Sequence, residues 1–149
     1  MPTLHDPATR ESIKARLMNL RPDAQRQFGK MSPDQMLWHC AEAMSLALGK
    51  VPYGEMPNVP PLPAGLIRWL MLNGPWPKGK IETAPQLKPK TNYDFEAERK
   101  RVLALMDELA SKPPSGEAVF HPILKRNTFE YQGKLHARHL THHLAQFGA

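Results

Sequence analysis

Several features that would point to particular protein classes are scarce or missing in this chain. Cysteine occurs once, as Cys40, so no disulfide can form within the chain, and we interpret Cys40 as a small core residue. No apolar run approaches the roughly 20 residues that a membrane-spanning helix requires, so we expect no membrane partner. The opening residues MPTLHDPATR lack the apolar stretch of a secretory signal peptide. These absences predict a cytoplasmic protein.

Further absences restrict the fold class and the kinds of partner. No stretch alternates apolar and polar residues as a strand would, and no internal repeat is present. The 149 residues therefore predict one domain, 1–149, which is long enough to bury a core. The net charge is +6, but there is no long basic run and no basic surface interleaved with aromatic residues. We expect no nucleic-acid partner.

Capping residues and apolar spacing predict four long helices. The clearest start is the segment 32–35 (Ser-Pro-Asp-Gln), which has the residues of a capping box with proline at the first helical position. Gly49 supplies the end of that helix, and Asp6 can cap the first helix. Asn127 and Glu130 have the spacing of a capping box for the last helix. The four predicted helices cover about 7–20, 33–48, 94–111 and the residues from 128 to about 147.

Prolines are concentrated between residues 50 and 92. Their density excludes a continuous helix or a central strand there, although a short helix fits at about 64–72. A connection this long has a natural place as the crossover of a helical bundle. We therefore predict an all-α fold, a four-helix bundle with a long proline-rich crossover containing a short helix. Trp69, Met71 and Trp76 of this region either cover the core, the favoured role, or meet another subunit.

Four of the seven histidines lie in the C-terminal stretch HARHLTHHLAQFGA. At about 100° per residue, His143 and His136 fall about 40° and 60° round the helix from His139, on the flank of its apolar face. His142 falls about 60° the other way and points nearly opposite that face. His139 and His143, one turn apart, can present two imidazoles to one metal ion.

A third ligand has to come from another element of the chain. His39 is the best candidate, since it lies on the inward arc of the second predicted helix, and three protein ligands are common in catalytic zinc sites. His136 could replace His139 or hydrogen-bond a bound ligand. Glu42, one turn beyond His39, could be a fourth ligand, an orienting group or a general base, or an ordinary charged residue at the edge of the bundle.

Several segments resemble the DinB-like superfamily, and more narrowly a bacterial branch of unknown function. The resemblance begins with FGKMS at 28–32 and QMLWH at 35–39. The most specific match is HLTHHLAQFG at 139–148, and KIETAP at 80–85 and His-Pro at 121–122 are further landmarks. The similarity extends from about Gln27 to the end of the chain.

The resemblance implies an up-down-down-up four-helix bundle that holds a divalent metal ion. The implied ligands are His39, His139 and His143, the set that the helical angles also favour. This chain departs from the branch at 123–126, where an aromatic residue and a glycine are usual, and at Phe28, where tryptophan is usual. These departures concern packing and details of a substrate site rather than the ligands.

Two hypotheses about function follow. Relatives implied by the resemblance include thiol-dependent transferases and metal-dependent hydrolases, so the leading hypothesis is a metal-dependent enzyme acting on a small-molecule substrate. Its cofactors would be a divalent ion such as zinc, nickel or iron and, in the transferase case, a low-molecular-weight thiol. Lys78 and Lys80 could bind carboxylates of such a thiol, although an ordinary solvated loop is the simpler reading. The alternative is a non-catalytic module, a homodimer that binds metal or serves a stress response.

Overall fold

The computed structural model describes residues 1–76 and 83–149, and this part of the chain is helical. Its only other regular pairs are two isolated β-bridges, Glu117 with Thr128 and His121 with Lys125. The all-α prediction is therefore confirmed. In chain order the helices are α1 (Pro7–Asn19), α2 (Pro33–Ala47), α3 (Ala64–Asn73), the short 3-10 helix η1 (Pro85–Leu87), α4 (Phe95–Ser111) and α5 (Phe129–Ala145).

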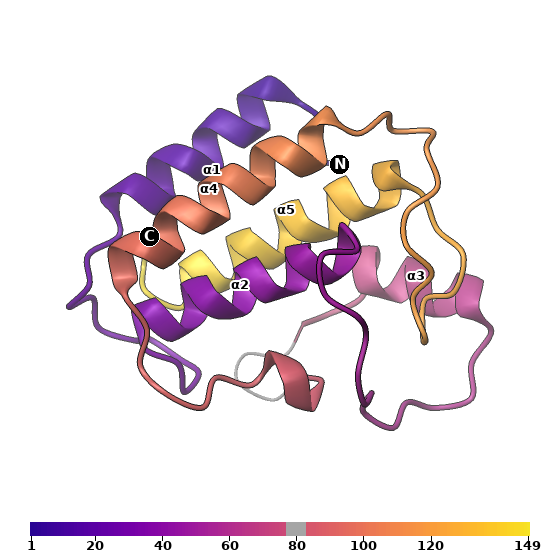
Figure 1. The fold of residues 1–149 in the computed structure, drawn as a ribbon, viewed down its shortest axis with the longest axis horizontal. Coiled ribbons are helices and arrows are strands. Elements are labelled where there is room, and N and C mark those ends of the chain that lie inside the picture. The colour runs from indigo at the N-terminus through magenta and orange to yellow at the C-terminus, as the bar shows by residue number, and fades with distance from the viewer. Residues whose placement is uncertain (77–82) are drawn as a thin grey trace.

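The four longest of these helices, α1, α2, α4 and α5, lie side by side (Figure 1). Helices α1 and α5 run in one direction along the molecule, and α2 and α4 run in the other (Figure 1). Helix α2 packs against both α4 and α5, and α1 packs against the same two helices. The proline-rich connection between α2 and α4 carries α3, which contacts α5, and η1, which contacts α2.

The start and end signals of the first two helices act as the sequence predicts. Asp6 accepts a hydrogen bond from the backbone N–H of Thr9 at 2.9 Å, which satisfies one free donor at the start of α1. At the start of α2, the backbone N–H of Ser32 donates to Gln35 Oε1 at 3.1 Å. Gly49 follows α2 with φ +74°, a left-handed conformation that glycine adopts without strain.

The predicted cap of the last helix was wrong by one residue. Thr128 caps α5, because its side chain accepts a hydrogen bond from the backbone N–H of Tyr131 at 3.2 Å. The Asn127 side chain is buried and has other partners. It donates to the Lys125 carbonyl at 2.9 Å and accepts from Gln132 Nε2 at 2.7 Å, so it ties the preceding connection to α5.

The core lies where the four long helices meet, and it consists mainly of leucine and methionine side chains. Its members without measurable exposure include Leu17, Met36, Leu37, Cys40, Met44, Val102, Met106, Leu109 and Leu144. Cys40 is thus a core residue, as predicted, and burial raises the pKa of its thiol far above the ordinary range.

Helix α3 does not bury any residue fully, although its sequence is strongly apolar. Trp69 is 58% exposed, so the expectation that it covers the core was wrong. It lies on the outer side of α3, whereas Trp76, just beyond the helix, is half-buried against histidines of α5. None of the helices in the described ranges has both the length and the apolarity that a membrane span requires.

The packing of Met106 gives a test of the core. Met106 is fully buried on α4, so Met106→Ala should lower the free energy of unfolding by about 2–5 kcal/mol through lost burial and an unfilled cavity. Met18→Ala is the matched control, since Met18 is 56% exposed on α1, and it should change stability by less than about 0.5 kcal/mol. Urea unfolding followed by circular dichroism measures both; equal effects would contradict the described core.

Candidate metal centre

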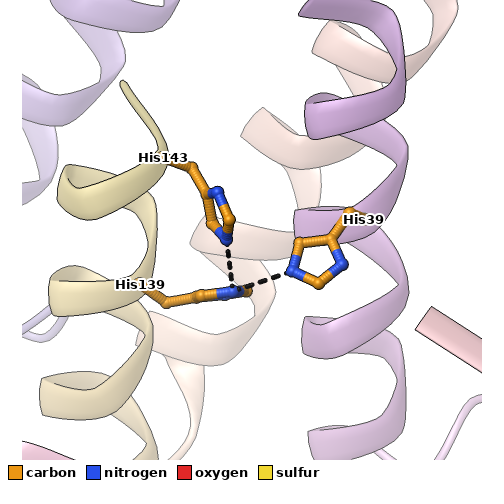
Figure 2. A group of neighbouring side chains, drawn as sticks. All are labelled: His39, His139 and His143. Atoms are coloured by element: carbon orange, nitrogen blue, oxygen red, sulfur yellow. Dashed lines mark hydrogen bonds between the residues drawn. The ribbon is translucent and has the colours of Figure 1, made fainter. Parts of the chain in front are cut away.

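Three histidines from two helices meet between α2 and α5. The ring of His39, on α2, faces the rings of His139 and His143, which lie one turn apart on α5 (Figure 2). The potential ligand atoms of the three side chains all lie within 4.8 Å of one another. The structure therefore brings together the three residues that the sequence singles out, from positions 100 residues apart in the chain.

The Nε2 atoms form the centre of this group. His139 Nε2 lies 3.0 Å from His39 Nε2 and 3.0 Å from His143 Nε2. The Nδ1 atoms of the other two rings point outward to oxygen atoms. His39 Nδ1 lies 2.8 Å from the carbonyl oxygen of Leu87, in η1, and His143 Nδ1 lies 2.9 Å from Gln146 Oε1.

These outer hydrogen bonds determine which nitrogen carries the proton. A carbonyl oxygen only accepts, so His39 Nδ1 and His143 Nδ1 are the donors, and in neutral rings their Nε2 atoms carry lone pairs. A neutral His139 ring carries a single N–H. Even if this N–H is on Nε2, it can form a linear hydrogen bond to only one of the two neighbouring lone pairs, that of His39 Nε2 or that of His143 Nε2. At least one close pair of nitrogens is therefore unfavourable without a cation between them.

Burial favours the neutral form of all three rings, and repulsion between rings adds to this effect at His139 and His143. Burial is the largest cause of the lowered pKa of His39, and it also lowers the pKa of His139, where the neighbouring His143 and His39 add to the effect. Burial together with His39 lowers the pKa of His143 to about 3. A neutral imidazole is the form that binds metal, so the site is in its ligating form at pH 7.

The donor set and its spacing fit a divalent transition-metal ion. Imidazole nitrogen suits zinc, copper, iron and nickel. Tetrahedral nitrogen ligands about 2.0–2.1 Å from zinc would be about 3.3 Å apart, and the observed 3.0 Å separations need a change of only a few tenths of an ångström. Hydrogen bonds to the far nitrogen of a ligating histidine, like those of Leu87 and Gln146, are typical of metal sites.

Gln146 is itself held in place by the segment before α2. The backbone N–H of Gln27 donates to the Gln146 carbonyl at 2.7 Å, and Gly29 lies against the Gln146 side chain. Gly29 has φ +82°, and a Cβ at this position would overlap the Gln146 amide nitrogen. This position therefore needs glycine for two reasons, its backbone conformation and the close approach of the orienting glutamine.

An aromatic side chain borders the group on the α3 side. The Trp76 ring lies edge-on to His139 at 6.0 Å and to His142 at 5.4 Å between ring centroids. Arg138 stacks on Trp76 at 4.7 Å from the ring centroid and donates to the carbonyl of Met71 at 2.8 Å, and Trp76 Nε1 donates to the same carbonyl at 3.2 Å. These contacts fix Trp76 beside the histidines.

The other residues singled out from the sequence lie outside the group. His142 packs against Phe28 and Trp76, in agreement with its predicted orientation away from the ion. Glu42 pairs with Arg101 of α4, which also bonds Glu98 at 3.1 Å, so its carboxylate is engaged away from the three histidines. His136 is buried beside His139 and is not one of the three converging residues. Lys78 and Lys80 fall in 77–82, outside the described residues.

Three contributors to the site were missed by sequence reasoning. Gln146 lies three residues after His143, a spacing that places both on one side of a helix, and this signal was available. Trp76 offered a weaker signal, as an aromatic residue whose partner could not be identified. Leu87 acts through its backbone carbonyl, so no side-chain pattern could have identified it.

Comparison of the chain with protein-family models, with curated proteins and with solved structures gave no match.

The buried histidines predict a stability change in mildly acidic solution. Their folded-state pKa values lie below the unfolded value near 6.5, about 3 for His143 and about 4 for His136, so the unfolded state binds protons first as the pH falls. Stability should be fully present above about pH 6.5 and fall as the pH drops toward these folded-state values, with the first part of the loss between pH 6.5 and 5. We expect metal-free protein in EDTA to lose about 1 kcal/mol or more over this range, measured by urea unfolding.

His136→Gln is the control for this effect. It removes one of the depressed titrations, so its stability should change less steeply over the same range, whatever its stability at pH 7. A wild-type protein with constant stability between pH 7 and 5 would contradict the neutral, buried state of these rings.

Proposed function

We propose that this protein binds one divalent metal ion through the Nε2 atoms of His39, His139 and His143. The observation that carries the proposal is the convergence of these three atoms, 3.0 Å apart in two pairs, while two Nδ1 atoms are held by acceptors that leave lone pairs at the centre. Zinc, nickel and iron all suit three imidazoles, since the donor type does not distinguish them.

We propose further that the fold is a four-helix bundle of the DinB-like superfamily. Support comes from the directions of α1, α2, α4 and α5 and from the motif at 139–148, which contains two of the proposed ligands and the glutamine that orients one of them. The shared role of His139, His143 and Gln146 gives this sequence motif a physical meaning.

The function that this site supports best is metal-dependent catalysis on a small molecule. A divalent ion bound by three neutral residues keeps an open position, where it acts as a Lewis acid or lowers the pKa of a bound water or thiol. The Leu87 carbonyl and Gln146 orient His39 and His143, and the Trp76 ring lies edge-on to His139.

Both a hydrolase and a thiol transferase are consistent with this arrangement. In the transferase form, the thiol sulfur bonds to an electrophilic carbon while the carbon–chlorine bond breaks. Chloride leaves with the bonding electrons, and the thiol proton passes to solvent.

A second candidate, a non-catalytic dimeric module, is favoured by one observation. Helix α3 and the residues before it expose an apolar row at helical spacing, Leu62, Leu66, Trp69 and Leu70, with exposures from 36% to 58%. Such a row is typical of a surface that meets another protein.

Metal analysis tests the proposed site. Untagged protein dialysed against zinc, nickel or ferrous iron should hold about one equivalent per chain. His39→Ala and His143→Ala should each weaken binding by at least about 100-fold, because each removes a direct ligand. His142→Ala is the matched control on the same helix and should retain the ion. Unchanged metal content in the first two variants would refute the site.

An activity screen separates the two candidate functions. Metal-loaded protein should convert a chlorinated electrophile in the presence of glutathione or another small thiol, or hydrolyse activated esters and amides, and His143→Ala should lose this activity. Product is measured by mass spectrometry and free chloride. Metal-loaded protein without turnover, together with a dimer in light scattering that Trp69→Ser dissociates, would favour the module instead.

A further inference from the structure

His136 has an unusual environment for a buried polar side chain. It lies on α5 one turn before His139, with 4% of its surface exposed and its ring 6.1 Å from the His139 ring. Its Nδ1 atom has no hydrogen-bond partner among the described residues. Arg10 Nε is also buried without a hydrogen-bond partner among the described residues. It lies 3.6 Å from a carboxylate oxygen of Asp107, however, whereas His136 Nδ1 has no such compensating contact. An unsatisfied buried polar atom costs about 1–3 kcal/mol, which a bound ligand can offset.

A second histidine belongs to the same neighbourhood. Burial is the main cause of the lowered pKa of His136, and His121, in the connection before α5, adds to the effect. His121 Nδ1 accepts backbone hydrogen bonds from Ile123 at 2.9 Å and Leu124 at 3.0 Å, so the proton of the neutral ring is on Nε2. The Tyr53 ring lies edge-on to His121 at 4.8 Å, and burial raises the pKa of its phenol to about 12, so the phenol keeps its proton.

The charge of the proposed metal site favours an anionic ligand beside His136. The three converging side chains are all histidines, without a carboxylate among the described members, so a bound divalent ion would keep its full double charge. Glu42, the nearest acidic candidate in sequence, is neutralised by Arg101. A ligand that completes the coordination of such an ion is favoured if it carries negative charge and can accept hydrogen bonds from neutral N–H and O–H groups.

We propose that His136 binds the anionic group of an exogenous metal ligand, a small carboxylate, thiolate or comparable anion. His136 donates a hydrogen bond from Nδ1 to this anionic group. This inference rests on the proposed metal site and adds the chemical class of the second ligand and the residue that recognises it.

Cobalt-loaded protein with azide as the anionic probe tests this proposal. The visible spectrum of Co²⁺ reports whether the ion is held and changes when azide binds. Wild type and every His136 variant should hold about one Co²⁺ per chain, because His136 is not a ligand. His136→Leu should raise the azide dissociation constant at least about tenfold, the loss expected for one hydrogen bond to a charged group.

Two conservative variants guard against a folding effect. His136→Asn places an amide nitrogen near the position of Nδ1 and should keep azide affinity within about threefold of wild type. His136→Gln places it near Nε2 and should resemble His136→Leu. His142→Leu, on the same helix, is the control and should bind azide as wild type does.

The cobalt and azide measurements distinguish failure of the proposed metal site from failure of the proposed role of His136. If wild type does not hold cobalt, the proposed metal site fails and this inference fails with it. If His136→Leu and His136→Gln hold cobalt with unchanged azide affinity, the metal site stands and the role of His136 is wrong. If His136→Asn and His136→Gln both lose cobalt while folded by circular dichroism, His136 is a ligand, which also overturns the proposal.

Discussion

The contact between Nε2 atoms at His139 is the constraint on which the other features of the site depend. Nitrogens 3.0 Å apart, without enough protons to bridge them, are unstable alone, and burial makes protonation costly. The cation that we propose among the rings would resolve this conflict. The Leu87 carbonyl and Gln146 accept hydrogen bonds from Nδ1 of His39 and of His143. The Nε2 lone pairs of these two rings are therefore directed toward His139.

This constraint explains why segments distant in sequence converge on two helices. The segment 27–29 holds Gln146, η1 supplies the Leu87 carbonyl to His39, and Trp76 borders His139 under the stacked guanidinium of Arg138. The long proline-rich connection thus does more than join α2 to α4. Prolines keep it from forming a continuous helix, so its backbone carbonyls remain free to bind side chains of the four-helix core.

The sequence predicted the positions and roles of some residues and not of others. His39, His139 and His143 could be chosen because a helix repeats its faces at a fixed angle, and the capping signals at Asp6 and Ser32 act within one turn. Asn127 showed the limit of such local rules. Its side chain has the chemistry of a cap, but its partners Lys125 and Gln132 are set by how the preceding connection folds against α5.

The sequence by itself determined the helical class, the capping of the first helices and the orientation of His142 away from the other three. These follow from periodicity and from contacts within a turn. Only the tertiary structure decided that Glu42 turns to Arg101, that Trp69 stays exposed while Trp76 borders the histidines, and that Leu87 fixes the His39 ring. The physical reason is that backbone acceptors and partners from distant segments carry no signature in residue type, and chain packing alone selects them.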